Sequence, residues 1–177
     1  MSVDGPRVPP LSPVERDERQ SALVREAGAE LGVYTTLVRH TDLFADFLPF
    51  GRRLLRFSSL EPREREVLIL RTAWRCRARY EWSHHEVIGR NAGLTDTDLA
   101  QLCAEAPTGL LMRAADELLA DHALGDGTWV ELTAAYSVAQ VIEVCMLVGE
   151  YAMLAGALNS LGVQIEDGYP VPSWDQP

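Results

Sequence analysis

The chain has 177 residues, a length that predicts one domain with its own hydrophobic core. Hydrophobic residues make up 47% and charged residues 24%, as in an ordinary soluble globular protein. The net charge of −10 argues against DNA or RNA as a partner, because neutralising phosphates requires a basic face. All 16 basic residues are arginines, which excludes Schiff-base, pyridoxal-phosphate and Walker-type lysine chemistry.

Residues 1–11 hold three prolines and predict a flexible N-terminal arm. The capping box that starts at Ser12 predicts a first helix to about Leu31. A broad apolar face predicts a second helix over residues 41–57, with a kink or break at Pro49.

Pro62 opens a third helix, expected to end near Arg79, and a fourth is expected from Glu81 to Asn91. Two shorter helices are predicted over residues 95–102 and 110–124. Capping boxes that start at Thr128 and Ser137 predict a helix to about Tyr136 and a last helix to about Leu161.

No segment shows β alternation, so the predicted fold class is all-α, with six to eight helices in a single domain over residues 12–165. A proline-rich tail, residues 166–177, follows it. The last helix is apolar nearly all round, but charged residues interrupt it, which argues against a membrane span. Because one small domain rarely buries a whole helix, we expect it to join subunits of a homo-oligomer, a dimer, trimer or hexamer.

The cysteines Cys76, Cys103 and Cys145 form no Cys-x-x-Cys pair, and the first ten residues lack the apolar segment of a secretory signal. We therefore expect free thiols in a cytoplasmic protein.

The densest chemical motif is Tyr80-Glu81-Trp82-Ser83-His84-His85. On a helix, Glu81 and His85 are one turn apart and share a face. A carboxylate beside an imidazole can fix the tautomer of the ring and favour its charged form, as a proton-transfer pair requires. The alternative is an ordinary ion pair on a solvated face. Adjacent histidines project about 100° apart and no His-x-x-x-His is present, so no metal site is predicted.

Two residues outside this motif are candidates for substrate binding. Arg71 lies on a stripe of arginines that either faces solvent or receives a substrate carboxylate or enolate oxygen. Glu150, in the apolar last helix, requires a partner: an arginine across an interface or a substrate group.

The stretch around this motif resembles the carboxymuconolactone decarboxylase family, within the alkylhydroperoxidase D-like superfamily. The resemblance runs from about Leu43 to Leu161, and its sharpest part is Tyr80-Glu81-Trp82-x-x-His85 followed by Gly89 and Ala92-Gly93-Leu94. Peroxidases of the superfamily carry Cys-x-x-Cys-x-x-x-His, where this chain has Ala78 and Glu81 in place of the cysteines.

The resemblance implies an alkylhydroperoxidase D-like helical bundle with a small pocket beside the Glu81/His85 helix, partly closed by a neighbouring subunit. It implies a role for Glu66, which falls where the peroxidases keep a relay glutamate. The candidate catalytic residues are Glu81, His85, His84, Glu66 and Tyr80. The candidate substrate-binding residues are Arg71, Glu150 and Trp82, the last as a pocket wall or packing residue.

The expected activity is that of a cofactor-independent lyase that decarboxylates or dehydrates a small carboxylated lactone or polyketide-like acid, in a biosynthetic or aromatic-degradation pathway. Two alternatives stay open: a thiol-independent peroxidase-like redox enzyme and a non-catalytic helical binding protein.

Overall fold

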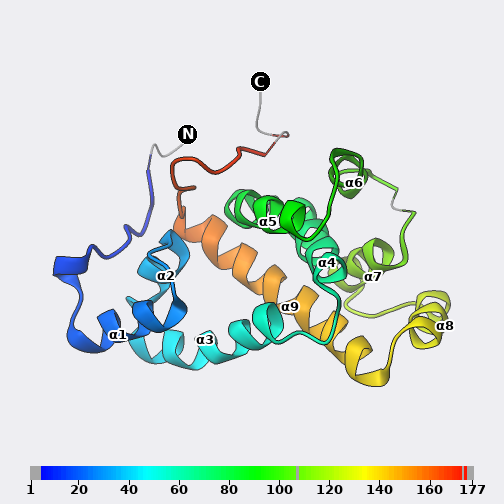
Figure 1. The fold of residues 1–177 in the computed structure, drawn as a ribbon, viewed down its shortest axis with the longest axis horizontal. Helices are drawn as coiled ribbons and strands as arrows, with labels where there is room; N and C mark the ends of the chain where they lie inside the picture. The colour runs from blue at the N-terminus through cyan, green and yellow to red at the C-terminus, as the bar shows by residue number, and fades with distance from the viewer. Residues whose placement is uncertain (1–4, 107, 173, 175–177) are drawn as a thin grey trace.

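The computed structural model describes residues 5–106, 108–172 and 174, and this part of the chain is helical without a strand (Figure 1). Its elements are the 3-10 helix η1 (Pro13–Glu15) and the α-helices α1 (Glu18–Ala27), α2 (Gly32–Leu37), α3 (Thr41–Arg56), α4 (Pro62–Arg75), α5 (Arg79–Asn91), α6 (Asp96–Leu102), α7 (Leu110–Ala120), α8 (Asp126–Ala135) and α9 (Val138–Leu161). The predicted all-α fold class is confirmed.

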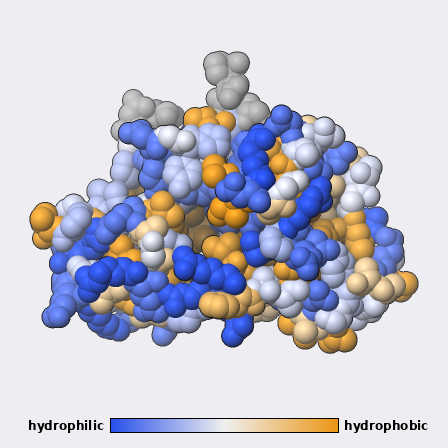
Figure 2. All heavy atoms as spheres, viewed as in Figure 1, coloured by the Kyte–Doolittle hydropathy of each residue, from blue (hydrophilic) through white to orange (hydrophobic). Residues whose placement is uncertain are grey.

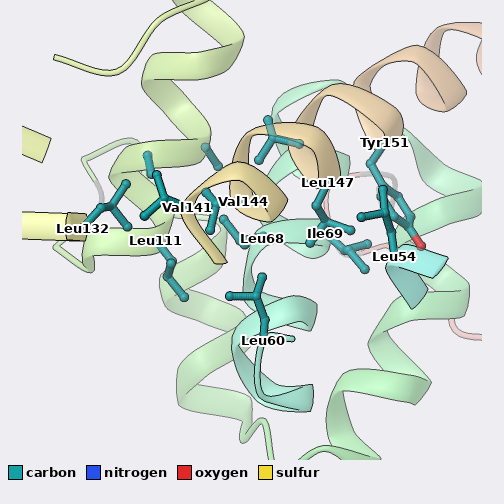
Figure 3. Close-up of a cluster of buried hydrophobic side chains, with 13 residues drawn as sticks. Leu54, Leu60, Leu68, Ile69, Leu111, Leu132, Val141, Val144, Leu147 and Tyr151 are labelled. Atoms are coloured by element: carbon teal, nitrogen blue, oxygen red, sulfur yellow. The ribbon is translucent and has the colours of Figure 1, made fainter. Parts of the chain in front are cut away.

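Helix α9 passes through the middle of the molecule, with α3 along one side and α4, α5 and α7 packed against it (Figure 1). Its buried face supplies Val144 and Leu147 to the main core cluster, where they meet Leu68 and Ile69 of α4 (Figure 3). The capping box at Ser137 starts α9 where predicted, since the Ser137 hydroxyl accepts the backbone N–H of Gln140.

A tight turn between α4 and α5 folds the second helix back against the first. Arg77 has a positive φ of 51°, which lets the chain reverse within a few residues. Gly89 then allows close packing, because a Cβ at this position would lie 2.8 Å from Leu94 Cδ1 and 3.1 Å from Leu70 Cδ1. The turn and the glycine together bring α5 next to Glu66 of α4.

The single helix predicted from Ser12 to Leu31 is wrong, because its residues form two short elements, η1 and α1. The capping box at Ser12 starts only η1, and α1 has its own cap, the Asp17 side chain that accepts the N–H of Gln20. Gly28, with a φ of 91°, ends α1. Helix α2 lies beyond Leu31, where no helix was predicted, and it brings the described residues to nine α-helices, one more than the upper prediction.

Several further details differ from prediction: α4 ends at Arg75 rather than near Arg79, and α7 ends at Ala120 rather than at residue 124. Helix α3 continues through Pro49, so no break occurs there. Helix α8 starts two residues before Thr128, whose hydroxyl donates a hydrogen bond to Glu117 Oε1 at 2.6 Å and so fixes α8 to α7.

The first described residues of the N-terminal arm and the described part of the C-terminal tail lie on the same side of the domain (Figure 1). In the predicted arm, the N–H groups of Arg7 and Val8 donate to the carbonyl of Leu161, and Leu11 donates to Thr35. Residues 1–4 of the arm and 173 and 175–177 of the tail lie outside the described part.

Helix α9 meets the length and composition criteria for a membrane span, with 44% of its apolar window buried inside the protein. The core helix of a soluble protein meets the same criteria. The remaining apolar face is open: the exposed fractions of Ile142, Met146 and Met153 are 60%, 48% and 59%. Burial of this face by another subunit stays a prediction.

Candidate active site

A cavity of about 130 Å³ lies between α2, α3, α5 and α9, on the face that is hollowed in Figure 2. Most of its wall is apolar, and cavities of about 150 Å³ hold a single benzene ring. The polar residues that line it are Tyr34, Arg52, Arg56, Tyr80, Glu81, His84, His85, Glu150 and Tyr151. The cavity therefore combines a ring-sized apolar space with several titratable groups.

His85 of α5 connects two other helices through its ring nitrogens. Nδ1 lies 2.7 Å from Oε2 of Glu66 on α4, and Nε2 lies 3.1 Å from the hydroxyl of Tyr151 on α9. Glu66 is fully buried, and its other oxygen accepts a hydrogen bond from Arg65 Nε at 3.0 Å. Glu66, His85 and Tyr151 thus form a continuous hydrogen-bonded chain that ends at the cavity wall.

The charges around these three hydrogen-bonded residues favour one arrangement of their protons. Burial by itself would raise the pKa of Glu66, but the charges and hydrogen bonds of His85 and Arg65 outweigh burial and lower it. An ionised Glu66 accepts the proton of Nδ1, which makes Nε2 the basic nitrogen of the neutral ring. Burial raises the pKa of Tyr151 well above its usual value, so its hydroxyl stays protonated and can relay a proton to or from Nε2.

Glu81 does not orient His85, and the predicted hydrogen-bonded pair of these two residues is wrong. Both carboxyl oxygens of Glu81 are buried and have no hydrogen-bond partner among the described residues. Burial, together with the nearby charge of Glu150, raises the pKa of Glu81 well above its usual range. Glu81 is therefore a neutral acid in the cavity wall, and Glu66 takes the orienting role.

Glu150 of α9 is a second carboxyl of this kind. Its Oε2 is buried without a partner in the described part of the chain, and burial raises its pKa to about 7. Gly51 of α3 makes room for it, because a Cβ there would lie 2.9 Å from Glu150 Oε1. The cavity therefore presents two carboxyl groups whose hydrogen-bonding capacity is available to a ligand.

His84 and Tyr80 also reach the cavity wall, but the C-terminal tail holds both side chains. His84 Nε2 lies 2.6 Å from Oε2 of Glu166, and the Tyr80 hydroxyl donates to Oε1 at 2.8 Å. The His84 ring packs between Tyr80 and Tyr169, with centroid distances of 4.4 and 3.9 Å. Burial lowers the pKa of His84 despite the adjacent carboxylate. These contacts indicate a positioning role for both residues.

Arg71 and Trp82 lie away from the cavity. The predicted substrate contact of Arg71 is wrong, and of the two roles predicted for Trp82 the structure shows packing and not a pocket wall. Arg71 is fully buried and pairs with Asp116 through Nε and Nη2 at 2.7 and 2.6 Å, while its Nη1 donates to two backbone carbonyls. Trp82 packs in a core cluster against Trp174 and donates its indole N–H to Glu86. Both residues stabilise the fold.

The structure thus gathers most of the predicted site. Five of the predicted residues line the cavity: Tyr80, Glu81, His84, His85 and Glu150. Glu66 does not line it but contacts His85. The sequence analysis missed Arg52, Arg56, Tyr151 and Glu166. None of the three cysteines lines the cavity, and no cluster of three or more metal-ligating side chains occurs within residues 5–106, 108–172 and 174.

The fold is an alkylhydroperoxidase D-like helical bundle. Residues 41–121 match the carboxymuconolactone decarboxylase family, as the sequence motif indicated. None of the curated proteins matches the chain.

Solved structures share this fold. An uncharacterized peroxidase-related protein from Silicibacter sp. TM1040 has a TM-score of 0.75 at 15% identity, over 95% of this chain and 97% of that one. An alkylhydroperoxidase AhpD core protein from Ralstonia eutropha JMP134 has a TM-score of 0.70 at 18% identity, over 85% and 84%. A cysteine-to-alanine variant of the debrominase Bmp8, in complex with 2,3,4-tribromopyrrole, has a TM-score of 0.69 at 16% identity, over 94% and 95%. At these identities, the likeness shows the fold alone.

Proposed function

We propose that this protein is a cofactor-independent lyase that decarboxylates or dehydrates a small oxygenated carboxylic acid or lactone by acid/base catalysis. The observation that carries the proposal is the Glu66–His85–Tyr151 chain beside the neutral carboxyl of Glu81 in one sheltered cavity. A base and an acid with separated protonation states are what such a reaction requires.

For dehydration, the imidazole of His85, directly or through Tyr151, accepts the proton on the carbon next to a carbonyl. The electron pair of that C–H bond forms the new double bond as the neighbouring C–O bond breaks. Glu81, protonated at the start, donates its proton to the departing hydroxyl, and water leaves.

For decarboxylation, the C–C bond to the carboxylate breaks and its electron pair moves into an adjacent carbonyl as carbon dioxide leaves. The enolate oxygen accepts a hydrogen bond from the neutral Glu81 carboxyl, which is stronger beside a mostly apolar wall than in bulk water. His85, after taking up a proton from solvent, transfers this proton to carbon, directly or through Tyr151, and the C–H bond replaces the broken C–C bond. The same residues therefore serve both reactions.

Of the alternatives, thiol chemistry has no support at this cavity, because no cysteine lines it. A non-catalytic binding protein would use the cavity without needing the basic nitrogen of His85. Activity measurements on a His85 variant therefore separate a lyase from a binding protein.

The test is a mass-spectrometric screen with carboxylated lactones and with β-hydroxy and β-keto acids, monitoring loss of carbon dioxide or of water. His85→Asn is the informative variant, because its amide nitrogen can take the place of Nδ1 beside Glu66 while Nε2 is removed. His122→Asn is the matched control, since His122 is exposed and asparagine tolerates its positive φ of 56°.

We expect turnover by the wild type and by His122→Asn, and at least a 100-fold lower rate for His85→Asn at equal helicity. An inactive wild type across the whole screen, or full activity of His85→Asn, would contradict the proposal.

A further inference from the structure

Two arginines of α3 form a cationic side of the same cavity. Arg52 and Arg56 are one helical turn apart and both line the cavity. Each is fixed by a hydrogen bond to the C-terminal end of α1: Arg52 Nη2 donates to the carbonyl of Glu26 at 2.5 Å, and Arg56 Nη2 to that of Ala27 at 3.3 Å. Their guanidinium groups are thus held in place without a ligand.

Much of their hydrogen-bonding capacity remains. A guanidinium has five N–H donors, and Arg52 uses part of its set in an ion pair with Glu26 at 3.4 Å. For Arg56, no carboxylate of the described residues lies within ion-pair distance. Both guanidinium groups act on Tyr34 of the cavity wall: burial raises the pKa of this tyrosine, and the two positive charges oppose the increase.

The arginines do not neutralise the cavity carboxyls. Both oxygens of Glu81 and Oε2 of Glu150 lack a hydrogen-bond partner in the described residues. One side of the cavity therefore offers positively charged donors, and another offers carboxyl groups that lack partners. A ligand that fits both has an anionic acceptor at one end and an oxygenated carbon at the other.

We infer that the cavity binds a small hydroxy or oxo carboxylic acid, with its carboxylate on Arg52 and Arg56 and its hydroxyl or carbonyl oxygen against Glu81 and Glu150. This inference deepens the proposed function and rests on it for the identity of the reacting end. The volume of about 130 Å³ limits the enclosed part of such an acid to about one six-membered ring. Guanidinium pairs recognise carboxylates bidentately, which gives orientation as well as affinity.

The inference has a chemical consequence. A carboxylate held by guanidinium groups is stabilised as an anion in the ground state, which slows its loss as carbon dioxide. The group that leaves is therefore at the other end of the substrate, beside Glu81 and His85. We expect the product to retain the arginine-bound carboxylate.

The subsite can be tested by binding alone, with benzoate and benzamide as probes at about pH 6, where benzoate is ionised. Arg52→Gln/Arg56→Gln is the test variant. Arg53→Gln is the control from the same helix, because the Arg53 guanidinium lies over the ring of Phe57, 5.6 Å from its centroid, and does not line the cavity. Arg56→Lys keeps the charge and loses the bidentate fork.

We expect the double substitution to weaken benzoate binding at least 10-fold and to leave benzamide binding unchanged, with Arg53→Gln behaving as the wild type and Arg56→Lys intermediate. Thermal melting of each variant verifies that the fold is intact. Equal weakening for both probes, or no benzoate binding to the wild type, would overturn the subsite.

Failure of the subsite is distinguishable from failure of the proposed function. Benzoate binding requires no turnover. If the wild type forms no product but binds benzoate in preference to benzamide, the lyase proposal is contradicted and the carboxylate subsite stands. If the wild type forms product but does not bind benzoate in preference to benzamide, the subsite is contradicted and the lyase proposal stands.

Discussion

The imidazole of His85 and the carboxylate of Glu66 lie 2.7 Å apart, between α5 and α4, and both side chains are buried. The ring is held on its other side by the Tyr151 hydroxyl at 3.1 Å. Three helices thus fix one imidazole, and its orientation does not depend on a ligand. This arrangement prepares the ring for proton transfer before a substrate arrives.

Glu66→Gln tests the orienting carboxylate. The neutral amide can still occupy the site but no longer stabilises a positive charge on His85, so we expect kcat to fall by about 10–100-fold with little change in KM. The pKa of Glu66 is lowered in the folded protein, so its ionised form adds stability above its usual pKa, and this contribution is lost as the pH falls through the folded-state value.

Urea unfolding at about pH 7 and pH 3 checks the second part of this prediction. The difference in the free energy of unfolding between wild type and Glu66→Gln should shrink at the lower pH. A difference that stays constant would show that ionisation of Glu66 contributes nothing.

Glu81→Gln should lower activity and raise stability. The pKa of Glu81 is raised in the folded state, so the unfolded chain releases this proton more readily, and folding loses stability as the pH rises above the usual glutamate value. Glutamine removes this penalty. At pH 8 we expect the melting temperature of Glu81→Gln to exceed that of the wild type by about 2–4 °C for each kcal/mol of added stability. Near pH 4 the increase should be smaller.

Activity of Glu81→Gln should fall at least 100-fold, since the amide donates no proton to a leaving group. Loss of both activity and stability would instead indicate a structural role for Glu81.

Arg71→Met tests the reassignment of this arginine from the site to the core. Its removal leaves the carboxylate of Asp116 and the carbonyls of Leu102 and Ala104 without their donors. Breaking a buried pair in this way costs about 3–5 kcal/mol of folding free energy. Arg75→Met is the control, because Arg75 is partly exposed and lies 3.6 Å from the same carboxylate.

Denaturant unfolding measures both variants. We expect a large loss for Arg71→Met and a loss below about 1 kcal/mol for Arg75→Met. If Arg71→Met folds with wild-type stability and has a raised KM, the reassignment is wrong.

Sequence patterns among neighbouring residues predicted the helices, but they could not predict contacts between segments that are distant in the sequence. Capping boxes and apolar spacing are local, and they gave the fold class and the start of α9. The failure at Ser12 is also local, because Asp17 provides a second cap and Gly28 ends the helix before the apolar pattern does. Within one helix, sequence spacing relates only neighbours such as Glu81 and His85.

The missed contacts are all long-range. Glu66 reaches His85 only because the turn at Arg77 reverses the chain. No sequence motif relates two residues at the spacing of Glu66 and His85. Glu66 was predicted only from the family resemblance. Nothing in the residues around Glu166 indicates that the tail returns to His84, 82 positions earlier. The arginine stripe placed Arg71 at the site although Arg71 pairs with Asp116 in the core, because the position of Asp116 cannot be read from periodicity.

Glu166→Gln tests the attachment of the tail. Glu166 accepts hydrogen bonds from the Tyr80 hydroxyl and the backbone N–H of Gly32 and pairs with His84. The amide cannot accept at both oxygen positions, so the tail after Gly162 should be cleaved several-fold faster in limited proteolysis. Asp167→Asn is the neighbouring control, and equal protection of Glu166→Gln and wild type would contradict the attachment.

The last prediction concerns the open face of α9, which we propose joins subunits of a homo-oligomer. Met146 and Met153 lie on this face, and Leu43 of α3, 62% exposed, borders the same apolar groove as Met153. Contiguous apolar surface of this kind is typical of subunit contacts. Met146→Glu/Met153→Glu would place two charges in such an interface, so we expect light scattering to show a shift from oligomer to monomer at micromolar concentration. Val14→Glu, on η1 and 94% exposed, should leave the mass unchanged. A monomeric wild type would contradict the proposal, because α9 would then keep its apolar face in water.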